Sequence, residues 1–457
     1  MTIDEIFQKA IKYHQAGDLQ QAENIYKEIL IDYPNNFYVL HHLGILYYQL
    51  KNYESAIEYI KKALQVDPTV ADAYYNLGNI YKDCGQLNEA IINFQKSLEL
   101  NPNNSDAYNN EGIIYKYKKQ LDEAINCFQK AIQLNPNNAI AHYNLGAISQ
   151  EKKQFDNAVA CFQKVLLINP DIFAVYYNLG VIFQEKKQFD EAIANYQKAI
   201  QLNPNLADLY YNLATAFLEK RKPDDAIANY QKAIQLNPNS IDAYCNLGTA
   251  FQEKGEFDNA IECYQKAIQL NPNLADLYCN LGNTLKKKGQ LDEAISYYRK
   301  AIQINPMFVE AYNNLGISLY TKGMLDEAIE NYGIALVLKP DFVEAYVHLG
   351  IVYQNQGNLD KADECFREAL KIKPDCVFCY SNLLFSMNYN YRHDAQTLAA
   401  EHLRFSKQII EPLSFLTTYH TNERDPNRKL RIGYVSPDFR RHPVSYFSEP
   451  VIIDHNR

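Results

Sequence analysis

The chain has 457 residues, a formal net charge of −9 and 47% apolar residues, a balance that is ordinary for a folded protein and argues against binding to the phosphate backbone of nucleic acids. Asp4 and Glu5 interrupt the first segment, which therefore does not read as a signal peptide, and no stretch approaches the roughly 18 apolar residues of a membrane span. The nine cysteines favour reduced thiols over a disulfide framework, and we predict a cytoplasmic protein.

One pattern recurs every 34 residues from about residue 3 to residue 375. A fixed period of this size indicates a stacked array of identical supersecondary units. Three series keep the step: prolines (Pro34, Pro68, Pro102, Pro136, Pro170, Pro204, Pro238, Pro272, Pro306, Pro340, Pro374), small residues (Gly44, Gly78, Gly112, Gly146, Gly180, Ala214, Gly248, Gly282, Gly316, Gly350) and alanines (Ala56, Ala90, Ala124, Ala158, Ala192, Ala226, Ala260, Ala294, Ala328, Ala362).

Each unit is predicted to form two helices. In residues 207–239, apolar residues recur at three- and four-residue spacing, with a break near residues 220–225. The Asn-Pro pair ends the second helix, because proline cannot continue it. The small residue at the Gly44 register allows the paired helices to approach closely. An aromatic series is expected to fill the space opposite: Phe94, Phe128, Phe162, Tyr196, Tyr230, Tyr264, Tyr298, Tyr332 and Phe366.

The 34-residue step, the Tyr-Asn-Leu-Gly motif, the alanine twenty places into the unit and the final Asn-Pro resemble tetratricopeptide repeats, from about Ile3 to Asp375 with a partial further unit over residues 378–390. The resemblance implies an all-α, right-handed superhelical solenoid whose concave groove is lined by the first helix of each unit. We therefore predict repeats over residues 1–376. Capping helices are predicted over residues 377–416, because the last unit would otherwise expose its apolar face.

Two polar series share one face of the first helices. Where both occur they are four residues apart, so their side chains lie on the same side of the helix. The amide ladder comprises Asn76, Asn110, Asn144, Asn178, Asn212, Asn246, Asn280 and Asn314, with Asn382 further on; the acidic ladder comprises Asp72, Asp106, Asp208, Asp242 and Asp276, continued by Glu310 and Glu344.

The amide ladder has two interpretations. An amide offers donors and an acceptor, so repeated amides can hold the backbone of an extended peptide whatever its sequence, and the carboxylates would add a preference for Lys, Arg, Ser or Thr. Alternatively, both series serve only solubility and helix starts, as in tetratricopeptide repeats generally. The predicted partners are proteins or peptides in extended conformation, with no nucleic acid and no membrane. Gaps argue against a uniform groove: Ile140 and Ala174 replace the acid, and His42 and His348 the amide.

A different pattern follows the repeats. Residues 417–429 form a polar linker, and residues 430–435 form a short apolar strand, followed by a loop and a predicted helix start at Ser445. The run "LRIGYVSPDFRRHPVSYF" resembles the opening of the catalytic region of protein O-linked N-acetylglucosamine transferases, in which a tetratricopeptide array precedes this segment. Residues 430–457 are therefore predicted to be a short, incomplete α/β segment, the truncated start of a glycosyltransferase domain.

The resemblance implies transfer of N-acetylglucosamine from UDP-N-acetylglucosamine to Ser or Thr of proteins, with His442 as the matching catalytic residue. The second, donor-binding lobe is not found in the sequence, so we expect the chain alone to be inactive and to need no cofactor. The principal prediction is a protein-interaction scaffold of the transferase family. The alternative is an active transferase completed by a second polypeptide, with UDP-N-acetylglucosamine as donor.

The remaining candidate sites are weaker. Cys376 and Cys379 have the spacing of a redox pair or of half a zinc site, with His393 and His402 as the further ligands. The cysteines of the repeats recur at fixed positions, however, which is typical of small packing residues. We therefore predict that these two cysteines also serve packing, that His41 and His42 lie on the groove surface, and that the chain has no metal site.

Overall fold

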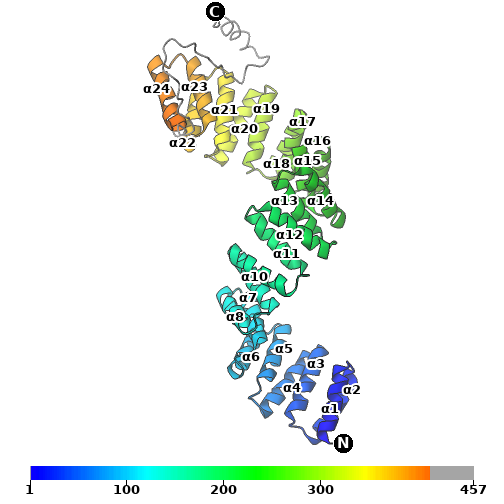
Figure 1. Ribbon diagram of the computed structural model, residues 1–457. Helices are drawn as coiled ribbons and strands as arrows, with labels where there is room; N and C mark the ends of the chain where they lie inside the picture. Colours follow the sequence, from blue (N-terminus) through cyan, green and yellow to red (C-terminus); the bar gives the residue numbers. More distant parts are fainter. Residues whose placement is uncertain (1, 412–457) are drawn as a thin grey trace, which may run out of the picture. The chain divides into compact units, whose positions relative to one another are not determined.

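The computed structural model describes residues 2–411 of the chain, and over this range it is all-helical, as predicted (Figure 1). The contacts divide the chain into two compact units, residues 1–338 and residues 339–457. The predicted linker over 417–429 and the predicted segment over 430–457 lie outside the described residues, and the predicted division at residue 376 stays a prediction. Among the described helices, none is long and apolar enough to cross a lipid bilayer.

The first unit consists of ten helical pairs, in which consecutive helices lie side by side (Figure 1). The first helices are α1 (Ile3–Gln15), α3 (Phe37–Gln49), α5 (Ala71–Asp83), α7 (Ser105–Tyr117), α9 (Ala139–Glu151), α11 (Phe173–Glu185), α13 (Ala207–Glu219), α15 (Ile241–Lys254), α17 (Ala275–Lys288) and α19 (Val309–Thr321). The second helices are α2 (Leu19–Asp32), α4 (Tyr53–Val66), α6 (Leu87–Leu100), α8 (Leu121–Leu134), α10 (Phe155–Ile168), α12 (Phe189–Leu202), α14 (Pro223–Leu236), α16 (Phe257–Leu270), α18 (Leu291–Ile304) and α20 (Leu325–Leu338).

The described part of the second unit continues the same pairing. It contains α21 (Val343–Asn355) and α22 (Leu359–Ile372), then α23 (Val377–Tyr389), α24 (Ala395–Phe405) and the π-helix η1 (Ser406–Ile410). Phe366 of α22 is fully buried and packs with Leu383 and Met387 of α23. The apolar face of the last complete pair is therefore covered by the helix that follows it.

The helix ends follow from local sequence. The second helix α8 ends at Asn135, whose backbone is extended because Pro136 follows it, and whose N–H donates to the carbonyl of Ala131 at 2.9 Å. The turn between the two helices of a pair needs one left-handed residue. Gly255 supplies it with φ of 82°, and Arg221 occupies the same register one repeat earlier with φ of 56°.

The close approach predicted between paired helices is confirmed. A Cβ atom built on Gly180 of α11 would lie 2.5 Å from the ring of Tyr196 on α12, which is closer than atoms in contact can be. Tyr196 is itself fully buried. The glycine thus lets an aromatic side chain of the second helix lie directly against the backbone of the first, and this contact recurs with the repeat.

Exposed ion pairs join consecutive repeats between α8 and the end of α19. A lysine just after or at the end of a first helix meets an aspartate in the first turn of the preceding second helix. Such exposed pairs contribute only about 0–1 kcal/mol each, but here they recur at one register along the array. The pairs are Lys152–Asp122 (2.6 Å), Lys186–Asp156 (2.8 Å), Lys220–Asp190, Lys254–Asp224 (2.9 Å), Lys288–Asp258 (2.5 Å) and Lys322–Asp292.

Candidate protein-binding face

The eight asparagines of the predicted amide ladder all lie in the first unit. Each is the sixth residue of its first helix, from Asn76 on α5 to Asn314 on α19, and each is half-buried. Their common position follows from the 34-residue step, which returns every unit to the same helical face. The structure therefore aligns these amides, while Asn382 occupies the equivalent place on α23 in the second unit.

Most of these amides bridge neighbouring first helices. Nδ2 of Asn178 donates to the hydroxyl of Tyr143 at 3.4 Å, and Nδ2 of Asn246 donates to the hydroxyl of Tyr211 at 2.9 Å. In each case the acceptor lies 35 residues earlier, next to the asparagine of the preceding repeat. The other bonds of this kind are Asn110 to Tyr75 (3.3 Å), Asn212 to Tyr177 (3.3 Å), Asn280 to Sγ of Cys245 (3.7 Å) and Asn314 to Sγ of Cys279 (3.8 Å).

Two asparagines of the ladder, Asn76 and Asn144, make a different hydrogen bond. Asn76 lies 3.0 Å from Nε2 of His41, which is buried, so this histidine is not groove surface as the sequence suggested. Burial lowers the pKa of His41 to about 4, so the neutral ring can accept the amide hydrogen. Asn144 instead accepts from Nζ of Lys116 at 3.4 Å. The acceptor series, one residue before each asparagine, was missed from the sequence although it has the same period.

The acidic ladder has a different environment. Asp72, Asp106, Asp208, Asp242 and Asp276 are all exposed, and each lies in the first turn of its first helix. A carboxylate in the first turn is stabilised by the helix dipole. This placement favours a contribution to the helix starts, and the exposed carboxylates are also available to a ligand.

Two clefts open beside the amide ladder. The larger, of about 850 Å³, is lined by residues that include Thr215, Tyr230, Asn246 and Thr249. The smaller, of about 370 Å³, includes Tyr196 and contains Asn212 one repeat earlier. Both volumes lie in the range of sites that hold a side chain or a small ligand. The clefts thus expose two consecutive members of the amide ladder to a ligand.

Hydrogen-bonded tyrosines close the bottom of these clefts. The hydroxyls of Thr215 and Tyr230 share a hydrogen bond of 3.0 Å, and Tyr196 donates to Oε1 of Gln184 at 2.9 Å. Burial raises the pKa of Tyr230 to about 12, so its hydroxyl stays protonated and uncharged at neutral pH. Both clefts therefore end in neutral polar groups, and their charge comes from the residues at the rim.

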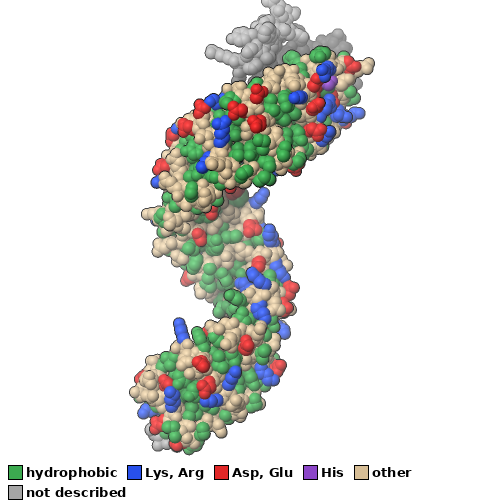
Figure 2. All heavy atoms as spheres, turned by 180° about the vertical axis from the view of Figure 1, so that it is seen from behind, with side chains coloured by type: hydrophobic (Ala, Val, Ile, Leu, Met, Phe, Trp, Pro, Cys, Tyr) green, Lys and Arg blue, Asp and Glu red, His purple; other side chains and the backbone are tan. Residues whose placement is uncertain are grey.

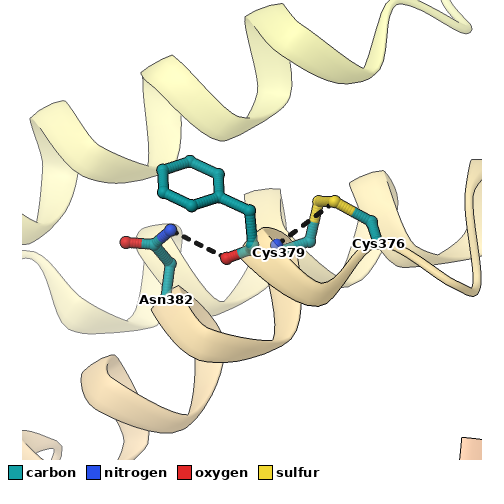
Figure 3. Close-up of a disulfide and its surroundings, with 4 residues drawn as sticks. Cys376, Cys379 and Asn382 are labelled. Carbon is teal, nitrogen blue, oxygen red and sulfur yellow. Dashed lines mark hydrogen bonds between the residues drawn. A yellow bond between two sulfur atoms is a disulfide. The ribbon is translucent and has the colours of Figure 1, made fainter. Parts of the chain in front are cut away.

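Cys376 and Cys379 are joined by a disulfide, so the prediction that they serve only as packing residues with reduced thiols is wrong for this pair (Figure 3). Cys376 is the N-cap of α23, and its Sγ accepts a hydrogen bond from the backbone N–H of Cys379 at 3.2 Å. The cap turns the Cys376 side chain back over the first helical turn, and the two Cα atoms lie 5.3 Å apart, within disulfide range.

The other seven cysteines are free, and the repeat cysteines behave as predicted. Burial raises the pKa of the Cys263 and Cys365 thiols to about 12, which makes both unreactive. The zinc alternative is not assembled, because Nε2 of His393 contacts Oδ2 of Asp363 at 2.5 Å and His402 is exposed. Within residues 2–411, no group of three or more His, Cys, Asp or Glu side chains is arranged to hold a metal ion.

The predicted catalytic residue His442 lies outside the described residues.

On the face that Figure 2 draws, Lys and Arg side chains are interspersed with Asp and Glu, and this mixture differs from the continuous basic surface that nucleic acids require.

Comparison with models of known protein families identifies the repeats along the chain. Models described as "TPR repeat" match residues 112–152, 222–255, 250–289, 282–323 and 318–357. Models described as "Tetratricopeptide repeat" match 37–70, 71–104, 139–172, 173–206 and 343–376, and also 93–126 and 195–228. Together these matches span residues 37–376, well over half of the chain. The chain belongs to the tetratricopeptide-repeat proteins. No curated protein matches the sequence.

Several solved structures are similar to parts of the chain. MamA is 34% identical, with a TM-score of 0.35, over 37% of this chain and 92% of MamA. YrrB, a TPR protein with an unusual peptide-binding site, is 29% identical, with a TM-score of 0.34, over 41% of this chain and 96% of its own. The pilF protein of Pseudomonas aeruginosa is 24% identical, with a TM-score of 0.40, over 45% and 94%.

Proposed function

We propose that this tetratricopeptide-repeat protein is an interaction scaffold that holds extended protein segments along its amide ladder. Tetratricopeptide repeats bind proteins or peptides, so the scaffold role follows from the repeats themselves. More specifically, we propose that the binding face is formed by the first helices of the first unit that carry the amide ladder, from Asn76 to Asn314.

The observation that carries this proposal is the partial use of each amide. Each side-chain amide has two N–H donors and a carbonyl acceptor. In Asn178 and Asn246, one bond goes to the tyrosine of the preceding repeat, which fixes the side-chain orientation. In Asn178 one N–H and the carbonyl remain for a ligand. In Asn212 the amide nitrogen also donates to the backbone carbonyl of Asp208 at 3.0 Å, and Asn246 also contacts the Tyr230 hydroxyl, so the side-chain carbonyl is the group that remains. Asn212 and Asn246 also line open clefts, where a ligand can reach them.

An extended backbone is the ligand that fits these groups. A peptide unit presents one N–H and one C=O. The side-chain carbonyl of each of these asparagines can accept from the N–H, and a free amide N–H, as in Asn178, can donate to the C=O. Because the amides repeat along consecutive helices, a stretched chain can meet them in succession, whereas a helix satisfies its own backbone groups internally. Binding through the backbone is independent of sequence, and the exposed carboxylates of the acidic ladder supply the preference for basic or hydroxyl side chains.

Removing two adjacent amides tests this. The double variant Asn212→Ala with Asn246→Ala is expected to weaken binding of unstructured peptides about thirtyfold, because two ligand hydrogen bonds are lost at about 1 kcal/mol each. The matched control is Asn195→Ala with Asn229→Ala, which removes asparagines of the second helices α12 and α14. Peptides selected from an unbiased library give the affinities by fluorescence anisotropy.

Methylation of the peptide backbone separates backbone from side-chain recognition. N-methylation of a bound peptide removes its N–H donors without changing its side chains, and it should weaken binding to the unaltered protein more than to the double variant. Equal affinities of the unaltered protein and the Asn212/Asn246 variant, with intact helicity by circular dichroism, would contradict the proposal.

A second candidate function is protein O-linked N-acetylglucosamine transfer, and the observation that favours it is the sequence of residues 430–447. We propose on that resemblance that His442 belongs to a transferase segment with UDP-N-acetylglucosamine as donor. Incubation of the purified chain, alone and with candidate partner polypeptides, with radiolabelled UDP-N-acetylglucosamine tests this. Absence of label on Ser or Thr in every mixture, and of any His442-dependent donor binding, would count against it.

A further inference from the structure

The two clefts beside the amide ladder occupy equivalent positions in consecutive repeats. Each is bounded by two first helices, the second helix between them and the turn before that second helix. The helices are α11, α12 and α13 for the smaller cleft and α13, α14 and α15 for the larger. Their lining residues correspond at a step of 34 positions, and the charged ones are Glu185 and Glu219, Lys187 and Arg221, and Glu219 and Glu253.

Glutamates form the rim of both clefts. The smaller has Glu185 and Glu219, the larger has Glu219 and Glu253, and Glu219 therefore lies between them and belongs to both. Within residues 2–411, none of the three is part of an ion pair, although the lysines nearby pair with aspartates of the second helices. Each cleft also contains one cation, Lys187 or Arg221, so two carboxylates face one positive charge.

We propose that these two clefts are successive side-chain pockets for basic residues, arginine or lysine, of an extended protein segment. The proposal rests on the proposed function, because the amide ladder holds the backbone of the segment while the clefts receive its side chains. In this proposal, the groove between α11 and α15 binds a segment of the partner protein that contains basic residues.

The chemistry of the lining supports a cationic side chain. Carboxylates only accept hydrogen bonds, and the hydroxyls of Thr215 and Thr249 can accept as well. A guanidinium has five N–H donors arranged as a fork that matches a carboxylate, and its aliphatic stem can lie against Leu218 and Pro223. An anionic or phosphorylated side chain would face an excess of negative charge in either cleft, since each has two carboxylates and one cation.

The repeat sets the spacing of the two basic residues. Axes of helices in contact lie about 8–10 Å apart, and an extended chain advances about 3.3 Å per residue. Two neighbouring clefts therefore fit side chains about three residues apart. Because the larger cleft has Thr215 and Leu218 where the smaller has Val181 and Gln184, and because Gln184 is bonded to Tyr196, the larger cleft has more room for arginine.

The test uses the full chain and a pair of isosteric peptides. One is an extended Ser/Gly peptide with two arginines three residues apart, and the other has citrulline, which is neutral, at both places. Fluorescence anisotropy at low salt should show about tenfold tighter binding of the arginine peptide, and the difference should shrink as salt is added. Glu219→Gln with Glu253→Gln should abolish that preference while the citrulline peptide binds as before.

Two further variants make the outcome decisive. Arg221→Gly removes the opposing cation and introduces the residue that Gly255 has at the same register, so it should strengthen arginine-peptide binding about threefold. Asn212→Ala with Asn246→Ala should weaken both peptides equally. If the glutamate variant keeps the preference for the arginine peptide while the asparagine variant weakens binding of both peptides, the pocket proposal is wrong and backbone binding by the amide ladder is supported. If the asparagine variant changes neither peptide, the proposed function fails. No binding of the arginine peptide at millimolar concentration overturns the pocket proposal.

Discussion

Replacing Glu111 by leucine is expected to stabilise α7 and its neighbours by about 2 kcal/mol at neutral pH, because a buried ionisable group is exchanged for apolar surface of similar size. Glu111 is 5% exposed and accepts a hydrogen bond from Nε2 of Gln95 at 3.0 Å. From α3 to α23, leucine has this register in every unit except that of Glu111: Leu43, Leu77, Leu145, Leu179, Leu213, Leu247, Leu281, Leu315, Leu349 and Leu383.

The stabilisation expected from Glu111→Leu should depend on pH. Burial raises the pKa of Glu111, against hydrogen bonds from Gln95, Cys127 and Tyr115 and the charge of Lys130, which lower it. The folded state therefore retains a proton that the unfolded chain releases above its ordinary value of 4.5. The stability contributed by the protonated form is fully present below that pH and is lost as the pH rises through the folded-state pKa.

Amide hydrogen exchange in α7 and α8 measures this locally, which suits an array whose units open separately. The difference in protection between Glu111→Leu and the unaltered protein should be small near pH 4 and should grow toward pH 7. Glu111→Gln is the neutral isostere and should share the flat pH profile of the leucine variant. A pH-independent difference would show that Glu111 ionises in the folded protein as it does in the unfolded chain.

Acidification should destabilise the contact between α3 and α5 by up to about 3 kcal/mol through one histidine. The pKa of His41 is lowered from 6.5 to about 4, mainly by burial and further by the charge of His42, and Asp72 acts in the opposite direction. In the folded state, neutral His41 accepts the amide hydrogen of Asn76. Between pH 6.5 and pH 4 the unfolded chain binds a proton at His41 and the folded protein does not. The stability of the folded state that is present above pH 6.5 is therefore lost as the pH falls toward 4.

The repeat provides its own control for this histidine. Tyr75, Tyr143, Tyr177 and Tyr211 occupy the equivalent register, and their hydroxyls accept the same amide bond. His41→Tyr should therefore preserve the bond to Asn76 and remove this part of the pH dependence. Hydrogen exchange in α3 and α5 at pH 7 and pH 4.5 gives the comparison. Identical losses of protection in both proteins would assign the acid sensitivity to other groups.

The 34-residue step was enough to predict the helical pairs, because each position of a repeat meets the same surroundings in every unit. Gly180 opposite Tyr196 is an example: the sequence places both, and the close contact follows from their register. The same argument predicted that the asparagines share a face. It did not predict that Asn178 would be bonded to Tyr143, since the two are 35 residues apart and their distance depends on how one pair rotates against the next.

Two departures have local causes. Cys376 and Cys379 looked like packing residues because cysteines recur in the repeats, but the cap at the start of α23 turns one side chain onto the other. His41 looked like groove surface because it is adjacent to His42. One residue along a helix turns a side chain by about 100°, and His41 consequently faces the neighbouring helix.

The sequence by itself determined the family, the helical period and which residue types recur on one face, because these depend only on spacing along the chain. Only the tertiary structure decided how much of each amide is left for a ligand and that two clefts share Glu219. Those properties depend on the rotation and separation of successive helical pairs, which are set by packing between repeats, and a one-dimensional period carries no measure of either.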